Sequence, residues 1–69
     1  LAIKNSTMTT DLFCVSKIQN SDQATIQFAE LGEGEKPLNK ILISISFKDA
    51  KQADQFQYNK IYHFQIEQL

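Results

Sequence analysis

The chain has 69 residues, a formal net charge of −1 and one cysteine, Cys14. A chain of this length forms one domain at most, and it buries only about 60% of the surface of its unfolded state. An internal disulfide is excluded, and one cysteine with one histidine cannot supply the four ligands of a structural zinc site. We therefore expect a homo-oligomer or another protein partner to add the missing stability.

All seven basic residues are lysines. Arginine is the side chain best suited to bidentate phosphate and guanine contacts, so this composition disfavours nucleic-acid binding. A single unpaired cysteine fits a reducing compartment, and no run of about 18 apolar residues is present. We expect a cytoplasmic protein without membrane contact. Residues 1–7 are interpreted as a tag remnant or flexible N-terminus, and residues 8–69 as a single small β-rich domain.

The first half of the chain predicts a β-hairpin. Residues 9–18 are rich in β-formers, and Asn20-Ser21-Asp22 supplies turn chemistry. Residues 24–28 then alternate strictly, which places three apolar residues on one face: Ala24, Ile26 and Phe28. Residues 32–37 contain all the glycine and proline of the chain and predict an exposed loop.

The second half predicts a strand, a helical turn and a last strand. Residues 41–47 alternate, with isoleucine or phenylalanine at every second position. Asp49 followed by Gln52 has the form of a capping box. Ala50, Ala53 and Phe56 follow at helical spacing, so a short helix is expected near residues 49–55. Asn59 is a turn residue, and in the last strand Tyr62, Phe64 and Ile66 share one face.

These elements predict an all-β fold, a small antiparallel β-barrel of four to five strands with one short helix. An OB-like barrel is favoured over an SH3-like one, because the helix falls between the last two clear strands.

The sequence contains no residue pattern that is typical of a catalytic site. His63 has no orienting carboxylate or nucleophile in reach along its own strand. Cys14 would have to meet His63 across strands, and no glycine-rich turn or oxyanion donor accompanies either residue. Phosphate-binding, dinucleotide and metal-ligand motifs are also missing. We predict a protein that is not an enzyme, with no catalytic residue, cofactor or metal.

The aromatic residues permit two interpretations. On an open sheet face, aromatic rings with interleaved lysines would bind single-stranded DNA or RNA by stacking. The residues that could supply such a surface are Lys40, Tyr58, Lys60 and Tyr62. Most aromatic residues, however, fall on the alternation face that must form the core, and core packing is the favoured interpretation.

Leu42 and Ile61 fall on the outward faces of their strands, and His63 shares the face of Ile61. Apolar residues on both faces of a strand indicate a second covered surface. We therefore expect these three residues at or near an oligomer or partner contact.

Residues 41–66 combine an alternating isoleucine strand, a helical turn and the segment Phe56-Gln57-Tyr58-Asn59-Lys60-Ile61-Tyr62. This order resembles the ending of small all-β proteins encoded by phages and prophages, in which a phenylalanine precedes a Gly-Lys-x-Tyr turn. Asn59 stands where glycine is usual. The resemblance implies a phage accessory protein, acting in the host cytoplasm, and assigns no functional residue.

The leading functional prediction is a non-enzymatic protein-binding or structural module, whose partner is another protein or a second copy. The alternatives are an OB-like single-stranded DNA/RNA-binding protein and a small inhibitor of a host enzyme or defence system.

Overall fold

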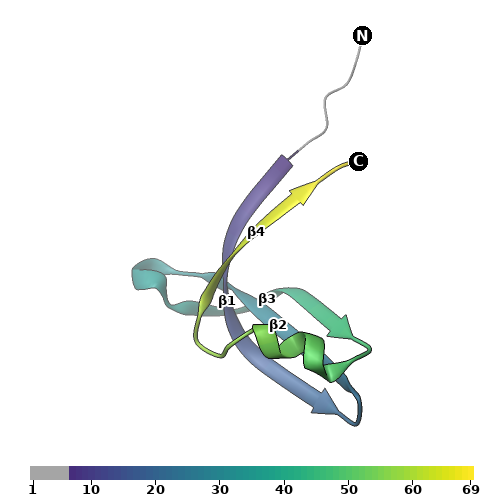
Figure 1. Ribbon diagram of the computed structural model, residues 1–69. Helices are drawn as coiled ribbons and strands as arrows, with labels where there is room; N and C mark the ends of the chain where they lie inside the picture. Colours follow the sequence, from purple (N-terminus) through teal and green to yellow (C-terminus); the bar gives the residue numbers. More distant parts are fainter. Residues whose placement is uncertain (1–6) are drawn as a thin grey trace.

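The computed structural model describes residues 7–69, and it is built from one antiparallel sheet (Figure 1). Its four strands lie in the order β3-β2-β1-β4. Their bounds are β1 Thr7–Asn20, β2 Gln23–Leu31, β3 Pro37–Phe47 and β4 Ile61–Glu67. Two 3-10 segments, η1 (Glu33–Glu35) and η2 (Ala50–Gln55), connect them. The predicted all-β, antiparallel class is confirmed. Residues 1–6 of the interpreted N-terminal extension lie outside the described residues.

The predicted hairpin is formed by β1 and β2. Asn20 pairs with Gln23, so Ser21 and Asp22 form the turn between them. The left-handed position is Ser21, with φ of 56°. The loop predicted at 32–37 is also present, although it is shorter, because η1 occupies its centre and β3 already begins at Pro37.

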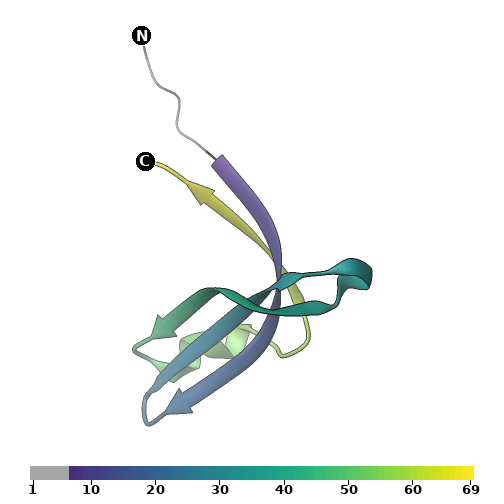
Figure 2. The same ribbon diagram turned by 180° about the vertical axis from the view of Figure 1, so that it is seen from behind.

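Strand β1 is long because it belongs to two ribbons. Its first half, Thr7–Phe13, pairs with β4, and its second half, from Leu12 onward, pairs with β2. A register shift between Cys14 and Ser16 leaves Val15 as an extra residue and bends the strand. The pairings give a three-stranded body and a two-stranded extension. Figures 1 and 2 show that the extension reaches away from the body. We call this extension, residues 7–11 with 63–67, the β1–β4 arm.

The core lies on the inner face of the sheet, under η2. Its fully buried residues come from β1, β2 and η2: Leu12, Cys14, Ala24, Ile26, Phe28 and Ala53. Phe28 is at the centre, because the rings of Phe56, Tyr62 and Phe64 all meet it edge to face. The predicted apolar face of residues 24–28 is therefore the inner face.

The predicted helix is present at the expected place, but as a 3-10 helix. The side chain of Asp49 accepts a hydrogen bond of 3.0 Å from the backbone N–H of Lys51 and so caps the first turn. Ala50, Ala53 and Phe56 recur every three residues, which matches the 3-10 period more closely than the α-helical one. All three therefore point the same way, and Ala53 is fully buried against the sheet.

Asn59 is in a turn, as predicted, and it adopts the left-handed conformation, with φ of 63°. Its N–H donates a 3.0 Å hydrogen bond to the carbonyl of Cys14, which fixes the turn into β4. We expect Asn59→Val to lower the free energy of unfolding by about 1–2 kcal/mol, because β-branched side chains are strained in this region. Asn59→Gly should change it by less than about 0.5 kcal/mol. Urea denaturation of the three proteins measures both values, and equal losses would contradict a conformational cause.

Candidate functional site

An apolar row crosses the outer face of the sheet, on the side away from η2. The strand register aligns Ile61 of β4 with Phe13 of β1. It then aligns Phe13 with Ala29 of β2, and Ala29 with Ile41 of β3. Directly opposed residues of antiparallel strands project from the same face of the sheet. We call these residues, together with the neighbouring Leu42, the outer apolar row: Ile61, Phe13, Ala29, Ile41 and Leu42.

The centre of the outer apolar row is buried, and its ends are exposed to solvent. Ala29 is only 1% exposed, although it stands apart from the core cluster around Phe28. Its cross-strand neighbours on the outer face are Phe13 and Ile41, both large apolar residues. Ile41, Leu42 and Ile61 remain 46%, 45% and 38% exposed. The row is thus an apolar strip whose two ends are accessible to a partner.

The position of Ile41 corrects a sequence-based expectation. Simple alternation places Ile41 on the face of Ile43 and Ile45. In the structure, Phe28 pairs with Ile43 but Ala29 pairs with Ile41, so Leu42 is an extra residue in β3. This bulge turns Ile41 to the outer face, and that face therefore carries an apolar residue that alternation alone does not provide.

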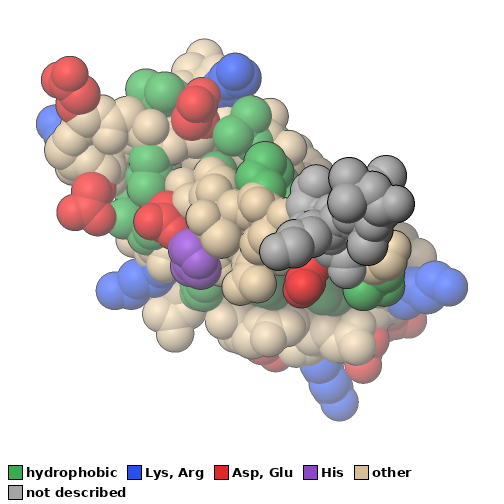
Figure 3. All heavy atoms as spheres, turned by 90° about the horizontal axis from the view of Figure 1, so that it is seen from above, with side chains coloured by type: hydrophobic (Ala, Val, Ile, Leu, Met, Phe, Trp, Pro, Cys, Tyr) green, Lys and Arg blue, Asp and Glu red, His purple; other side chains and the backbone are tan. Residues whose placement is uncertain are grey.

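Polar side chains border the outer apolar row. On one side, Nδ1 of His63 lies 2.6 Å from Oδ1 of Asp11 across the arm. On the other side, the hydroxyls of Thr25 and Ser46 form a hydrogen bond of 3.0 Å between β2 and β3. Figure 3, a view of the molecule from above, shows hydrophobic side chains at the surface among polar and acidic ones, while lysines project at the rim. An apolar strip with a polar border is the usual layout of a protein contact surface.

His63 has the carboxylate partner that sequence reasoning did not find. Asp11 faces it from β1, and the pair forms because β1 and β4 are neighbours in the sheet. Cys14 projects to the inner face, whereas His63 projects to the outer face, so the two do not meet. Burial raises the pKa of the Cys14 thiol, while the charge of Lys17 and a backbone hydrogen bond act in the opposite direction. Cys14 serves as a small buried apolar residue.

The residues considered for nucleic-acid binding do not gather on one surface. Lys40 is on β3 and Tyr62 is on β4, which are the opposite edges of the sheet. The ring of Tyr62 packs on Phe28 and Phe56, and its hydroxyl accepts a 2.8 Å hydrogen bond from the N–H of Gln57. Tyr62 therefore contributes mainly to the core.

The other members of that set differ in their surroundings. The Nζ of Lys40 lies 3.7 Å from a carboxylate oxygen of Glu30. Tyr58 is 54% exposed, and its hydroxyl accepts a 3.2 Å hydrogen bond from the N–H of Lys17. Lys60 is exposed two residues further along the chain. Only Tyr58 and Lys60 combine an accessible ring with a nearby lysine.

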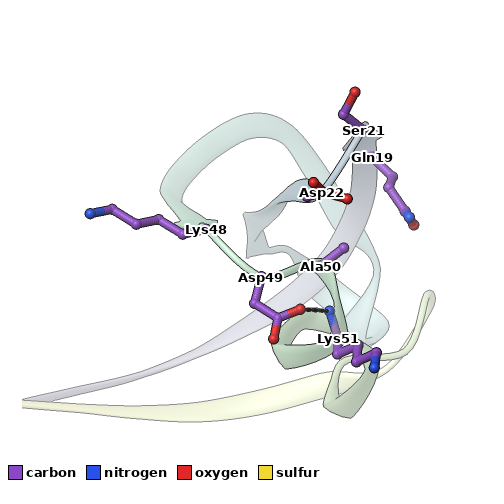
Figure 4. A pocket seen from close by; sticks show the side chains of 7 residues that line it. All are labelled: Gln19, Ser21, Asp22, Lys48, Asp49, Ala50 and Lys51. Atoms are coloured by element: carbon purple, nitrogen blue, oxygen red, sulfur yellow. Dashed lines mark hydrogen bonds between the residues drawn. The ribbon is translucent and has the colours of Figure 1, made fainter.

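A shallow hollow of about 460 Å³ lies where the β1–β2 turn meets the start of η2 (Figure 4). The backbone N–H of Ala50 donates a 2.7 Å hydrogen bond to the carbonyl of Asp22, which joins the two segments. The side chains around it are mixed in charge: Gln19, Ser21, Asp22, Lys48, Asp49 and Lys51. Equal numbers of lysines and aspartates give no preference for an anion or a cation, and Asp49 is already used as a cap.

Within residues 7–69, no group of three or more His, Cys, Asp or Glu side chains could hold a metal ion. No helix in the same residues has the length and apolar character needed to cross a membrane.

No family model, curated protein or solved structure matches this chain. The functional argument therefore depends on the surface itself. Sequence reasoning identified Leu42 and Ile61 but missed Phe13, Ala29 and Ile41. A usable signal for two of them exists, since Phe13 alternates with Leu12 and Cys14, and Ala29 directly follows Phe28.

Proposed function

We propose that this protein is a non-enzymatic protein-binding module that acts through the outer apolar row. The observation that supports the proposal is the alignment of one apolar residue from each of the four strands, with Leu42 beside them, on the face that η2 leaves uncovered. Full burial of a leucine or isoleucine side chain is worth about 1.5–3 kcal/mol, so covering the exposed ends of the row would give a partner substantial affinity.

The test compares partner binding by the wild type and by the double variant Leu42→Ser/Ile61→Ser. Proteins retained from a lysate of the source organism by the wild type are identified, purified and titrated individually by calorimetry. We expect at least one to bind the wild type and to lose tenfold or more in affinity with the double variant, which corresponds to about 1.4 kcal/mol.

Ile18→Ser is the matched control, because Ile18 is 53% exposed and lies outside the outer apolar row. It should bind like the wild type. If every purified partner binds the double variant as tightly as the wild type, the outer apolar row is not the binding surface.

The alternative is single-stranded nucleic-acid binding, and the exposed ring of Tyr58 next to Lys60 is the observation that favours it. Fluorescence anisotropy with a labelled oligonucleotide at low and moderate salt separates the two functions. We expect no saturable binding. Micromolar binding that weakens steeply with salt and is lost in Tyr58→Ala would favour the alternative instead.

We further propose that the fold is an OB-like version of the small β-barrels rather than an SH3-like one. The placement of η2 between β3 and β4 supports this, and so does a bent β1 that pairs with both β2 and β4. Within this proposal, a phage accessory protein or a small inhibitor of a host enzyme would each use the outer apolar row to bind its protein target.

A further inference from the structure

The two edges of the sheet are very different. In the described part of the chain, β3 and β4 are the outermost strands. Strand β3 carries Pro37 and Lys40 and has two register shifts, all of which obstruct pairing with an additional strand. Strand β4, with the sequence Ile-Tyr-His-Phe-Gln-Ile-Glu, has no proline and no lysine, and its pairing with β1 runs without a shift. Within residues 7–69, the edge of β4 thus carries none of these obstacles to pairing.

The hydrogen-bond pattern shows which groups of β4 are open. The N–H of Cys14 donates a 2.9 Å bond to the carbonyl of Lys60. Antiparallel pairs alternate between bonded and non-bonded, so Tyr62, Phe64 and Ile66 direct their backbone groups toward β1. The remaining residues of β4 therefore direct their N–H and C=O groups outward: Ile61, His63, Gln65 and Glu67.

The β1–β4 arm is expected to have little stability by itself. It is only two strands wide, and ribbons of two strands are marginally stable in water. Its inner face continues the core outward through Phe64, and it ends with Met8 and Ile66, which are 57% and 47% exposed. An additional strand beside β4 would widen the arm and cover part of this apolar surface.

We propose that this strand is β4 of a second copy, paired antiparallel about a two-fold axis at Phe64. This register pairs all seven residues of β4. Residues whose N–H and C=O groups point away from β1 then stand opposite each other, as hydrogen bonding in an antiparallel ladder requires. On the inner face, Phe64 meets Phe64 of the partner subunit, and Tyr62 meets Ile66 of the partner subunit. On the outer face, His63 meets Gln65 of the partner subunit.

Charge and composition favour a second copy over an unrelated strand. In the register centred on Phe64, no two like charges stand opposite each other, because the acid of Glu67 faces Ile61. Apolar residues meet apolar residues along the whole inner face.

The dimer contacts run along the backbone edge of β4 and share only Ile61 with the outer apolar row. Variants at other positions therefore test the dimer separately from the proposed function. Light scattering at several concentrations should show a particle of twice the chain mass. Gln65→Pro should be monomeric, because proline removes an N–H that points outward and leaves the bonds to β1 in place. Leu42→Ser, on the opposite edge strand, should remain dimeric. A monomeric wild type at every concentration would overturn the proposal, and so would a dimeric Gln65→Pro variant.

A cross-linking experiment checks the register without depending on the proline variant. Bonded antiparallel partners have Cα atoms about 5.5 Å apart, within the range that a disulfide spans. Oxidising an equimolar mixture of His63→Cys and Gln65→Cys chains should give a covalent heterodimer. Each variant alone should give little cross-linked product, because its own cysteines would be about 8 Å or more apart. Equal yields in all three samples would contradict the register centred on Phe64.

Discussion

Replacing Phe28 with alanine will lower the free energy of unfolding by about 3–5 kcal/mol. Phe28 is fully buried at the centre of the inner face. Three aromatic rings meet it edge to face, with centroids 4.7 to 6.0 Å away, and they come from β4 and the segment after η2. The small alanine side chain removes all of these contacts at once, and the rings around the cavity can collapse only in part.

The consequence is large for a chain of this size. Stabilities of roughly 0.05–0.15 kcal/mol per residue put the whole domain at about 3–10 kcal/mol, so Phe28→Ala removes a large fraction of it. Urea denaturation followed by circular dichroism, at one fixed protein concentration, measures the loss. Ile18→Ala is the control, because Ile18 is mostly exposed, and it should change stability by less than about 0.5 kcal/mol. Equal losses in the two variants would show that Phe28 is not the centre of the core.

Replacing Leu12 with alanine will lower the free energy of unfolding by about 2–5 kcal/mol and will loosen the arm. Leu12 is fully buried, and it pairs with Tyr62 of β4 on one side and with Glu30 of β2 on the other. It stands where the two ribbons that share β1 overlap. Loss of its side chain therefore weakens the contact between arm and body as well as the core.

The same leucine-to-alanine substitution at Leu42 is the matched control, because Leu42 is 45% exposed. Leu42→Ala should lose clearly less stability than Leu12→Ala in the same denaturation experiment. Amide hydrogen exchange tests the second part of the prediction. In Leu12→Ala, the amides of Tyr62 and Phe64, which bond to β1, should lose more protection than those of the β2–β3 ribbon. A uniform loss over the whole sheet would show that Leu12 supports the core only.

Local patterns in the sequence were sufficient to predict the strands and the inner face. Ala24, Ile26 and Phe28 occupy every second position, and side chains of a strand change face at every residue. The hairpin turn at 20–22, the cap at Asp49 and the left-handed Asn59 were predictable for a similar reason, because each depends on the chemistry of a few adjacent residues. The helix type was missed, since Ala50, Ala53 and Phe56 fit both a 3-10 and an α-helical spacing over so short a segment.

The candidate binding surface was determined by the pairing of distant segments. Ile41 faces outward because a bulge at Leu42 changes the register against β2. The spacing of isoleucines in the sequence of β3 places Ile41 on the opposite face, with Ile43 and Ile45. Asp11 and His63 come together only because β1 pairs with β4, and they are 52 residues apart. Alternation is a local property with a period of two, whereas register and bulges depend on which strands become neighbours and how their side chains pack. For this protein, the sequence alone determines which residues can be buried, and the tertiary structure decides which apolar residues remain on the surface and where they meet.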